Sequence, residues 1–503
     1  MVRRLLSPLR AVLPVEAGER PLALLLYAIL TLMVLSDWVG KVGADSLFVK
    51  RYGVQYIPMM YLITPVAVLV ISALLFTVLR RHTGRSLLTN YVAIVIVASL
   101  AIHFALPQGG IVLPIAYVFA HGVKEIVYLL FWIYAGNLYS SNQSKRLFPL
   151  FAGAMLSGKI LGGFAVGALA PIIHTENFIG AQAFGFAGCL VLMLVFRRHL
   201  PAERDDSAGV PAPRGVVASL QDSLEGYRTI TSDRLLRALA VTVFFWYLLM
   251  QLGTYLYLVG LDVRSTVSSA RGSEDAFSQL YASVYTSSSL VALAIQLLLT
   301  GPLLRRLGVS RMLFLLPMWY FGAFAAAAAS FNFVTAVAIQ LGERVVIPAV
   351  HRPATELVYD QVPSGVRQRA RAFLSGGVNS LGNFAAAAVL LGASASGIPV
   401  SMVLVFAAGA SVAFFVSAWF VRRSFGRRLA QNLEGDDGEL ADNASQMLTG
   451  ERHATFRKRE VTAPLVDDAT PPDTLAVLIQ DMLRTVGESP DNARAERERG
   501  VAA

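Results

Sequence analysis

The chain contains a series of apolar segments, each long enough to cross a lipid bilayer, and this feature limits its fold more than any other. A transmembrane helix needs about 20 mostly apolar residues. Segments of this kind cover about residues 21–40, 56–79, 87–106, 111–136, 147–173, 178–196, 236–260, 279–304, 311–330, 333–351, 370–393 and 399–421. The composition agrees, because 55% of the 503 residues are hydrophobic, 15% are charged and the mean hydropathy is +0.57. We therefore predict an all-α integral membrane protein with twelve transmembrane helices.

Lysine and arginine are distributed unevenly over the loops between these segments. The even-numbered loops are basic, as at Arg80 and Arg81 after the second segment and Arg305 and Arg306 after the eighth. The odd-numbered loops are nearly bare, and their exceptions are Lys50, Arg51, Arg264 and Arg271. Because basic loops stay in the cytoplasm, we expect a multi-pass protein of the cytoplasmic (inner) membrane with both termini cytoplasmic. The net charge of +10 then reflects topology and not a nucleic-acid surface.

The apolar segments form two sets of six, separated by the longest internal polar stretch. We expect a cytoplasmic N-terminal segment (1–20), an N-terminal six-helix bundle (21–196), a cytoplasmic linker (197–235), a C-terminal six-helix bundle (236–423) and a cytoplasmic tail (424–503). Within the largely disordered tail, the apolar spacing of residues 473–486 predicts one short helix. No signal-peptide cleavage site follows the first segment, so we expect it to stay in the protein.

The two sets of segments resemble each other. LRRHTGRSLL (79–88) follows the second segment and LRRLGVSRML (304–313) follows the eighth, at an offset of about 225 residues. FAGAMLSGKILGG (151–163) and FLSGGVNSLGN (373–383) similarly begin the fifth and eleventh segments. Two parallel six-helix repeats with both ends on one side of the membrane are the plan of the major facilitator fold.

Motifs of enzymes, cofactors and metal sites are missing from the sequence. Cys189 is the single cysteine, and neither H-E-x-x-H nor G-x-S-x-G occurs. GAMLSGKI (153–160) matches part of a phosphate loop, but Ile160 stands where Ser or Thr is needed and the segment is apolar. We therefore expect no enzymatic activity, no cofactor and no bound metal.

Ionisable side chains inside the apolar segments are the candidates for function, because such groups are costly in a bilayer unless they face a cavity or a partner. The candidate substrate-binding residues are Lys124, Lys159, Arg344, Arg352, Tyr128 and Asn379, and the candidate coupling or gating residues are Asp37, Glu125 and Glu343. Several cations in a cavity of low dielectric constant favour an anionic solute. Neighbouring residues on a helix point about 100° apart, so we expect Glu125 and Glu343 to pair with cations on other segments.

Structural roles are the alternative interpretation of the same residues. Lys124 with Glu125, or Arg352 with Glu356, would then neutralise each other or bridge helices. Asp37 and Lys41 would lie near the membrane interface. Polar residues such as Asn379 are as typical of helix–helix hydrogen bonds as of ligand contacts.

One stretch resembles a known family. LLFWIYAGNLYSSNQSKRLFPLFAGAMLSGKILGG (129–163) is similar to the ATP/ADP translocases and their bacterial relatives, which share a Phe-Trp-x-x-Ala core, a basic turn and a glycine-rich helix. The matching positions are Phe131, Trp132, Lys145, Arg146, Phe148, Pro149 and Leu150. GADSLFVKRYGVQYIP (43–58) resembles the family's segment after the first span. The resemblance covers about residues 20–420 and implies the same twelve-helix transporter fold.

The sequence also departs from that family. ATP/ADP exchangers carry a Lys-Asp pair in the first span, where this chain has Ser36-Asp37, and their acidic residue before Phe-Trp falls near Ala120. The resemblance therefore implies a relative whose substrate differs. We expect a secondary active transporter of an anionic solute, such as a nucleotide or phosphorylated metabolite, working by exchange or proton coupling. The alternative is a non-transporting membrane scaffold or sensor that binds a cytoplasmic partner through the tail.

Overall fold

The computed structural model describes residues 19–79, 84–139, 141–197, 200, 227–228, 230–268 and 274–434. Every regular element among them is helical. The N-terminal half consists of α3 (Arg20–Leu47), α4 (Ile57–Leu79), α5 (Gly84–Ala105), α6 (Val112–Leu138), α7 (Ser141–Ile173) and α8 (Phe178–Val195). Short turns of helix join them: η1 (Phe48–Gly53), η2 (Val54–Tyr56), η3 (Leu106–Gln108) and η4 (Thr175–Asn177).

The C-terminal half repeats this pattern with more irregular helices. Its elements are α10 (Arg234–Ser268), α11 (Glu274–Leu298), α12 (Thr300–Ala329), α13 (Phe333–Leu341), η5 (Gly342–His351), α14 (Arg352–Tyr359), α15 (Ser364–Phe373), η6 (Leu374–Val378), α16 (Asn379–Ala395) and α17 (Val400–Glu434). The segments η5 and η6 are π-helical and continue their neighbours, so α13–η5–α14 and α15–η6–α16 each form one span. Irregular π-helical turns of this kind are frequent at functional sites.

The described residues contain eleven helices long and apolar enough to cross a membrane. The first of them, Arg20–Ile71, runs through both α3 and α4. Gly53 divides it, because its φ of 117° lies in a region that side chains other than glycine rarely adopt. Counting α3 and α4 separately gives the predicted twelve spans. The fold is thus an all-α, multi-pass membrane fold of the major facilitator type.

Some predicted segments differ from the structure or fall outside it. The helix α17 continues to Glu434, into residues expected to belong to the tail, and the tenth span continues beyond 351 to Tyr359. Most of the expected linker and the tail from 435 onwards, including the predicted helix at 473–486, lie outside the described residues.

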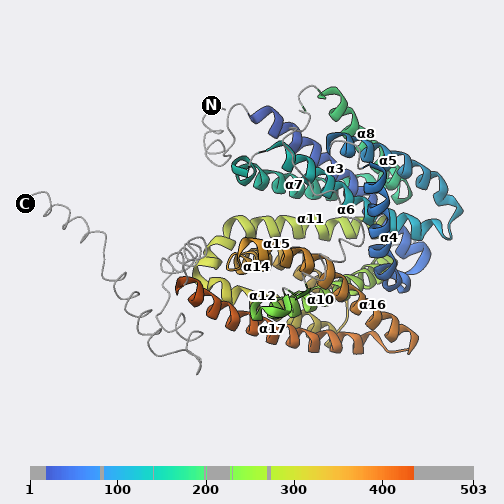
Figure 1. The fold of residues 1–503 in the computed structure, drawn as a ribbon. Coiled ribbons are helices and arrows are strands. Elements are labelled where there is room, and N and C mark those ends of the chain that lie inside the picture. The colour runs from blue at the N-terminus through green and yellow to red at the C-terminus, as the bar shows by residue number, and fades with distance from the viewer. Residues whose placement is uncertain are drawn as a thin grey trace, which may run out of the picture.

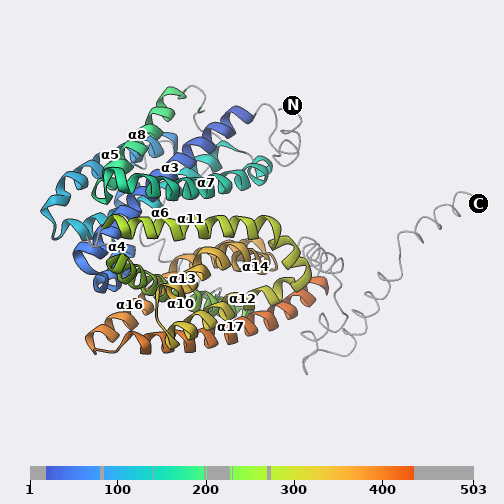
Figure 2. The same cartoon turned by 180° about the vertical axis from the view of Figure 1, so that it is seen from behind.

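The two halves lie one above the other, and α3 begins and α17 ends at the same end of the molecule (Figures 1 and 2). We call this end the terminal side and the opposite end the distal side. Between the halves, α4 packs on α16 and α7 packs on α11. The internal repeat relates α4 to α11 and α7 to α16. It therefore relates the α4–α16 interface to the α7–α11 interface, as a two-fold axis between the halves requires.

The buried core shows where the halves meet. One large cluster joins residues of both halves, and its N-terminal members, such as Trp38, Phe48 and Phe178, come from the distal ends of their helices. A second cluster, with Leu30 and Phe151, is made only of N-terminal-half residues and lies toward the terminal side. The halves therefore share one apolar core on the distal side, and the N-terminal half keeps its own core on the terminal side.

Candidate functional site

Three charged residues follow one face of α3. Asp37, Lys41 and Asp45 are spaced by four residues, which places them on the same side of a helix. The opposite face packs closely on a neighbouring helix, because a Cβ atom at Gly43 would lie 2.7 Å from Cβ of Phe178 on α8. Asp37 and Asp45 are only 1% and 2% exposed. The charged face therefore points toward α6 and the C-terminal half.

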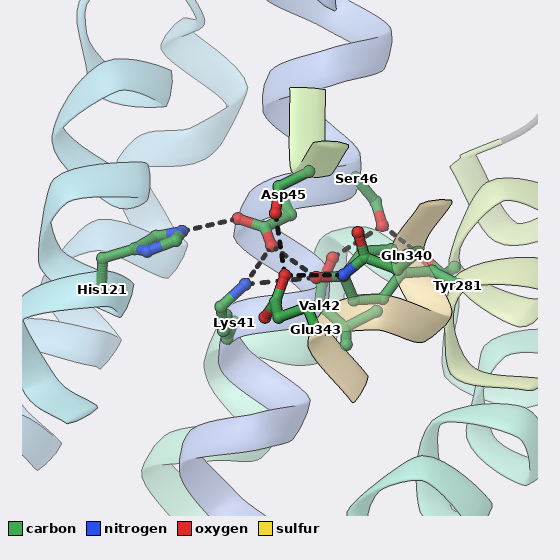
Figure 3. Close-up of polar contacts among 10 residues, drawn as sticks. Lys41, Val42, Asp45, Ser46, His121, Tyr281, Gln340 and Glu343 are labelled. Carbon is green, nitrogen blue, oxygen red and sulfur yellow. Dashed lines mark hydrogen bonds and ion pairs between the residues drawn. The ribbon is translucent and has the colours of Figure 1, made fainter. Parts of the chain in front are cut away.

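Asp45 is the centre of a polar network that joins the halves (Figure 3). Its carboxylate accepts hydrogen bonds from Lys41 Nζ at 2.5 Å and from the Tyr281 hydroxyl at 3.2 Å, and it lies 2.9 Å from His121 Nε2. Lys41 Nζ also donates to the Tyr281 hydroxyl at 3.2 Å. Because Tyr281 belongs to α11, the carboxylate receives a hydrogen bond from the opposite half of the protein.

Aromatic rings continue this contact toward the middle of the membrane. Trp38 of α3 stacks on Tyr285 of α11, with ring centroids 3.5 Å apart. The guanidinium carbon of Arg344 lies 4.2 Å from the centroid of the Tyr285 ring and 5.7 Å from that of Trp38. Cation–π contacts of this kind stabilise a buried cation, and the negative charge of Glu343 also acts on Arg344. Arg344 forms no ion pair with any of the described residues.

Three other predicted cations lie within electrostatic range of Lys159 on α7. They are Lys124, on another span of the same half, and Arg344 and Arg352, which share one span of the opposite half. Lys124 forms an ion pair with Glu125 at 2.8 Å. Within the described part of the chain, neither Lys159 nor Arg352 forms an ion pair. The structure thus gathers positive charge from both halves near mid-membrane depth.

Two predicted polar residues have clear partners. The Tyr128 hydroxyl donates to Oδ2 of Asp37 at 3.1 Å. Asn379 accepts a hydrogen bond from Asn383 Nδ2 at 3.1 Å, one turn further along α16. Tyr128 therefore belongs to the charged region around α3, whereas the hydrogen bond of Asn379 lies within its own helix.

The expectation that Glu125 and Glu343 pair with cations on other spans was wrong, whereas the alternative pairing of Lys124 with Glu125 is confirmed. Glu125 does not pair with a cation on another span but with Lys124, its neighbour in sequence. The side chains of Lys124 and Glu125 are 39% and 59% exposed. Although adjacent residues leave a helix about 100° apart, these two side chains are long enough to bend toward each other. Glu343 instead accepts hydrogen bonds from Thr254 Oγ1 and Gln340 Nε2, each at 2.9 Å.

The alternative pairing of Arg352 with Glu356 is also wrong, because Glu356 pairs with Arg371 of α15. Sequence reasoning missed the contacts between the halves that Asp45 and Trp38 make with Tyr281 and Tyr285. It also missed His121 as a partner of Asp45. One signal was present, since the four-residue spacing of Asp37, Lys41 and Asp45 already marks one helix face.

Ion pairs close the distal side between the halves. Lys50 Nζ lies 2.7 Å from Oδ1 of Asp262 on α10. Arg51 Nε lies 2.6 Å from Oε1 of Glu274 on α11, and Arg51 also contacts Glu176 of its own half at 3.1 Å. These pairs explain why Lys50 and Arg51 are exceptions among the bare distal loops.

A histidine contributes to the same closure. His174 Nδ1 lies 2.8 Å from Oδ2 of Asp275, and the other carboxylate oxygen accepts hydrogen bonds from the backbone N–H and hydroxyl of Thr175. The hydrogen bond and the negative charge of Asp275 raise the pKa of His174 above its usual value. This side chain lies in the loop between α7 and α8, where it is 65% exposed.

Comparison with solved structures supports the fold. The nucleoside transporter NupG superposes with a TM-score of 0.56 at 14% sequence identity, covering 80% of this chain and 98% of that one. A POT family transporter in complex with 5-aminolevulinic acid gives a TM-score of 0.52 at 12% identity, covering 78% and 95%. An auto-inhibited POT family peptide transporter gives 0.50 at 12% identity, covering 89% and 98%.

These likenesses show that the chain has the fold of multi-pass membrane transporters of the major facilitator type. No protein-family model matches the sequence, and no curated protein matches it either. The resemblance to the ATP/ADP translocases in particular therefore finds no support in these comparisons.

Proposed function

We propose that the protein is a secondary transporter of a small anionic solute of the nucleotide or phosphorylated-metabolite class, moved by alternating access. It would lie in the cytoplasmic membrane with both termini in the cytoplasm, as the basic loops suggest. The fold supports a transporter, because the similar solved structures are described as transporters of nucleosides or peptides. Their substrates differ, so the substrate has to be argued from the charges of this chain.

The proposal of an anionic substrate rests on one observation. Lys159 interacts electrostatically with three other cations, namely Lys124, Arg344 and Arg352. Bringing like charges together in a medium of low dielectric constant is unfavourable unless an opposite charge compensates them. Lys159, Arg344 and Arg352 have no carboxylate within ion-pair distance among the described residues. Glu343 and Asp37 act on Arg344 and Lys159 only from beyond ion-pair distance. A bound anion would add negative charge, and arginine in particular suits phosphate oxygens.

Alternating access is supported by where the halves are joined. The distal side has a shared apolar core and ion pairs from Lys50 and Arg51 to the opposite half. The N-terminal half has a separate core on the terminal side. Rocking the halves about the mid-membrane region would break the distal contacts and bring the terminal ends together. The structure would then represent the state that is closed on the distal side.

The test is binding and uptake by the full chain in proteoliposomes, screened against nucleotides, inorganic phosphates and organic anions. For an anion that binds, Lys159→Gln and Arg344→Gln should each raise Kd at least tenfold, which corresponds to about 1.4 kcal/mol. Arg305→Gln, which removes an exposed arginine on α12, is the matched control and should leave Kd unchanged. Equal affinity of all three variants would refute the anion site, and binding of neutral solutes alone would refute the substrate class.

A further inference from the structure

Asp37 is a buried carboxyl group with an incomplete set of partners. It is 1% exposed, and its Oδ2 accepts a single hydrogen bond, from the Tyr128 hydroxyl. Its Oδ1 is buried and has no hydrogen-bond partner within the described residues. Asp45, two turns along the same helix face, contrasts with it, because Lys41, His121 and Tyr281 all contact the Asp45 carboxylate.

The cations around Asp37 are already engaged with other carboxylates. Lys124 interacts electrostatically with Asp37 but forms its ion pair with Glu125, and Lys41 forms its ion pair with Asp45. The charged and titratable groups that act on Asp37, or on which Asp37 acts, come from four elements: Lys41 of α3, Tyr91 of α5, Lys124, Glu125 and Tyr128 of α6, and Lys159 of α7. None of them forms an ion pair with Asp37.

A buried carboxylate anion with one neutral donor and no ion pair carries a large desolvation cost. Binding a proton on Oδ1 removes the charge and leaves the hydrogen bond from Tyr128 to Oδ2 in place. We propose that Asp37 is a proton-binding site, occupied in this distal-closed state, and that its proton is thermodynamically coupled to anion binding at Lys124. The second part rests on the proposed function, whereas the first does not.

The coupling follows from the charges. With Asp37 neutral, the positive charge of Lys124 loses one source of compensation and attracts an anion more strongly. Coupling between two binding equilibria is reciprocal, so a bound anion also favours the proton on Asp37. A protein in which proton and anion favour each other would carry both in the same direction. The other predicted acids fit this role less well. Glu125 already forms an ion pair with Lys124, and Glu343 accepts two hydrogen bonds.

Infrared spectroscopy tests the proton without any substrate. At neutral pH exposed carboxyl groups are ionised, so only a carboxyl that stays protonated contributes a carbonyl stretching band of the acid form. The full-length protein in liposomes should show such a band, and Asp37→Asn should lack it. Glu176→Gln, which removes an exposed carboxyl group of the distal loop, is the control and should keep it. Tyr128→Phe should keep the band at a shifted frequency, because only its hydrogen bond is lost, and this variant also serves if Asp37→Asn does not fold. An unchanged band in Asp37→Asn would overturn the proposal. If Asp37→Asn does not fold, an unchanged band in Tyr128→Phe would overturn it.

Binding of ATP, used as an anionic probe, tests the coupling. The affinity of the wild type should be constant while Asp37 holds its proton and should fall as pH rises above that range, by up to tenfold per pH unit for one linked proton. Asp37→Asn should bind ATP with the weaker pH dependence that comes from ATP itself, and Glu176→Gln, which changes an exposed acid of the distal loop, should keep the wild-type slope. Equal slopes in wild type and Asp37→Asn would refute the coupling. If ATP does not bind at any pH, the proposed nucleotide class fails, and the infrared measurement still decides whether Asp37 holds a proton.

Discussion

Arg51 allows the distal closure to be tested with one matched pair of substitutions. Its guanidinium group contacts Glu274 in the opposite half and Glu176 in its own half. Glu274→Gln removes one of the charges that hold the two halves together, and Glu176→Gln removes a similar charge without affecting the contact between halves. Both substitutions keep the shape of the side chain. Only the first should shift the protein toward a state that is open on the distal side.

The expected size follows from the geometry of the pair. Arg51 donates two hydrogen bonds to Glu274, from Nε at 2.6 Å and from Nη2 at 2.9 Å, which is a strong bidentate arrangement. Solvent screens it, because the side chains are 32% and 25% exposed. We therefore expect about 1 kcal/mol, at the upper end for exposed pairs. That free energy corresponds to a change of about fivefold in the ratio of open to closed protein.

The assay is the labelling rate of a cysteine that opening would expose. Ser278 is fully buried and hydrogen-bonds to Ser46 and Thr175 of the other half, so Ser278→Cys in a Cys189→Ala background reports separation of the halves. In detergent, a hydrophilic maleimide should label this cysteine about fivefold faster when Glu274→Gln is present. The increase should shrink in high salt, which screens the wild-type ion pair.

Two results would refute the reasoning. Equal labelling in wild type and Glu274→Gln would mean that the pair contributes nothing to closure. An equal increase in Glu176→Gln would mean that loss of a carboxylate next to Arg51, and not separation of the halves, changes the rate.

Three further predictions concern the same architecture. Tyr281→Phe removes a hydrogen bond to a buried charged group, worth about 1.5–3 kcal/mol, and should raise the same labelling rate at least tenfold; an unchanged rate would exclude Tyr281 from the closure. His174 pairs with Asp275 when protonated and its pKa is raised, so its contribution to closure is full below its ordinary pKa of about 6.5 and is lost as pH rises through the raised value. The ratio of the wild-type labelling rate to that of His174→Gln should therefore increase with pH, and a constant ratio would contradict this assignment. For topology, a single cysteine at Gln108 should react with an impermeant reagent outside intact cells and one at Ser207 should not; the reverse pattern would refute the predicted orientation.

The fold could be predicted from the sequence because the length of an apolar segment and the charge of a loop are each visible within one short stretch of chain. Twelve apolar segments and two repeated motifs predicted the spans and the two halves, and the helices of the structure follow them. Two exceptions to the loop pattern, Lys50 and Arg51, had no explanation at that level. They became clear only through Asp262 and Glu274, which lie more than two hundred residues further along the chain. Periodicity shows which way a side chain points but not which side chain it meets.

The acidic residues show the same limit more sharply. Glu125 was expected to find a cation on another span, and adjacent positions on an ideal helix supported that expectation. The structure pairs it with Lys124, because two long and partly exposed side chains can bend toward each other. Asp37 was predicted as a coupling or gating residue, with an interfacial position as the alternative, and neither prediction included its almost complete burial. Burial and unfilled hydrogen-bonding positions depend on the neighbouring helices, and no pattern within one segment reports them.

The positions of Asp37 and Asp45 on α3 suggest how one helix takes part both in the contact between the halves and in proton binding. Asp45 contacts the opposite half through Tyr281, so separating the halves on the distal side removes one of its donors. Asp37 lies on the same helix face, and its partner Tyr128 belongs to the N-terminal half, so its hydrogen bond survives such a movement. What changes for Asp37 is the surrounding charge, since Lys41 would lose the contact with Tyr281 that it now shares with Asp45. A shift of Lys41 along α3 would alter how strongly the carboxyl group of Asp37 holds a proton, because the two groups already interact electrostatically. Opening of the distal side and proton release would then be linked through a single lysine, and Lys41→Gln should weaken that link while leaving the carboxyl group of Asp37 in place.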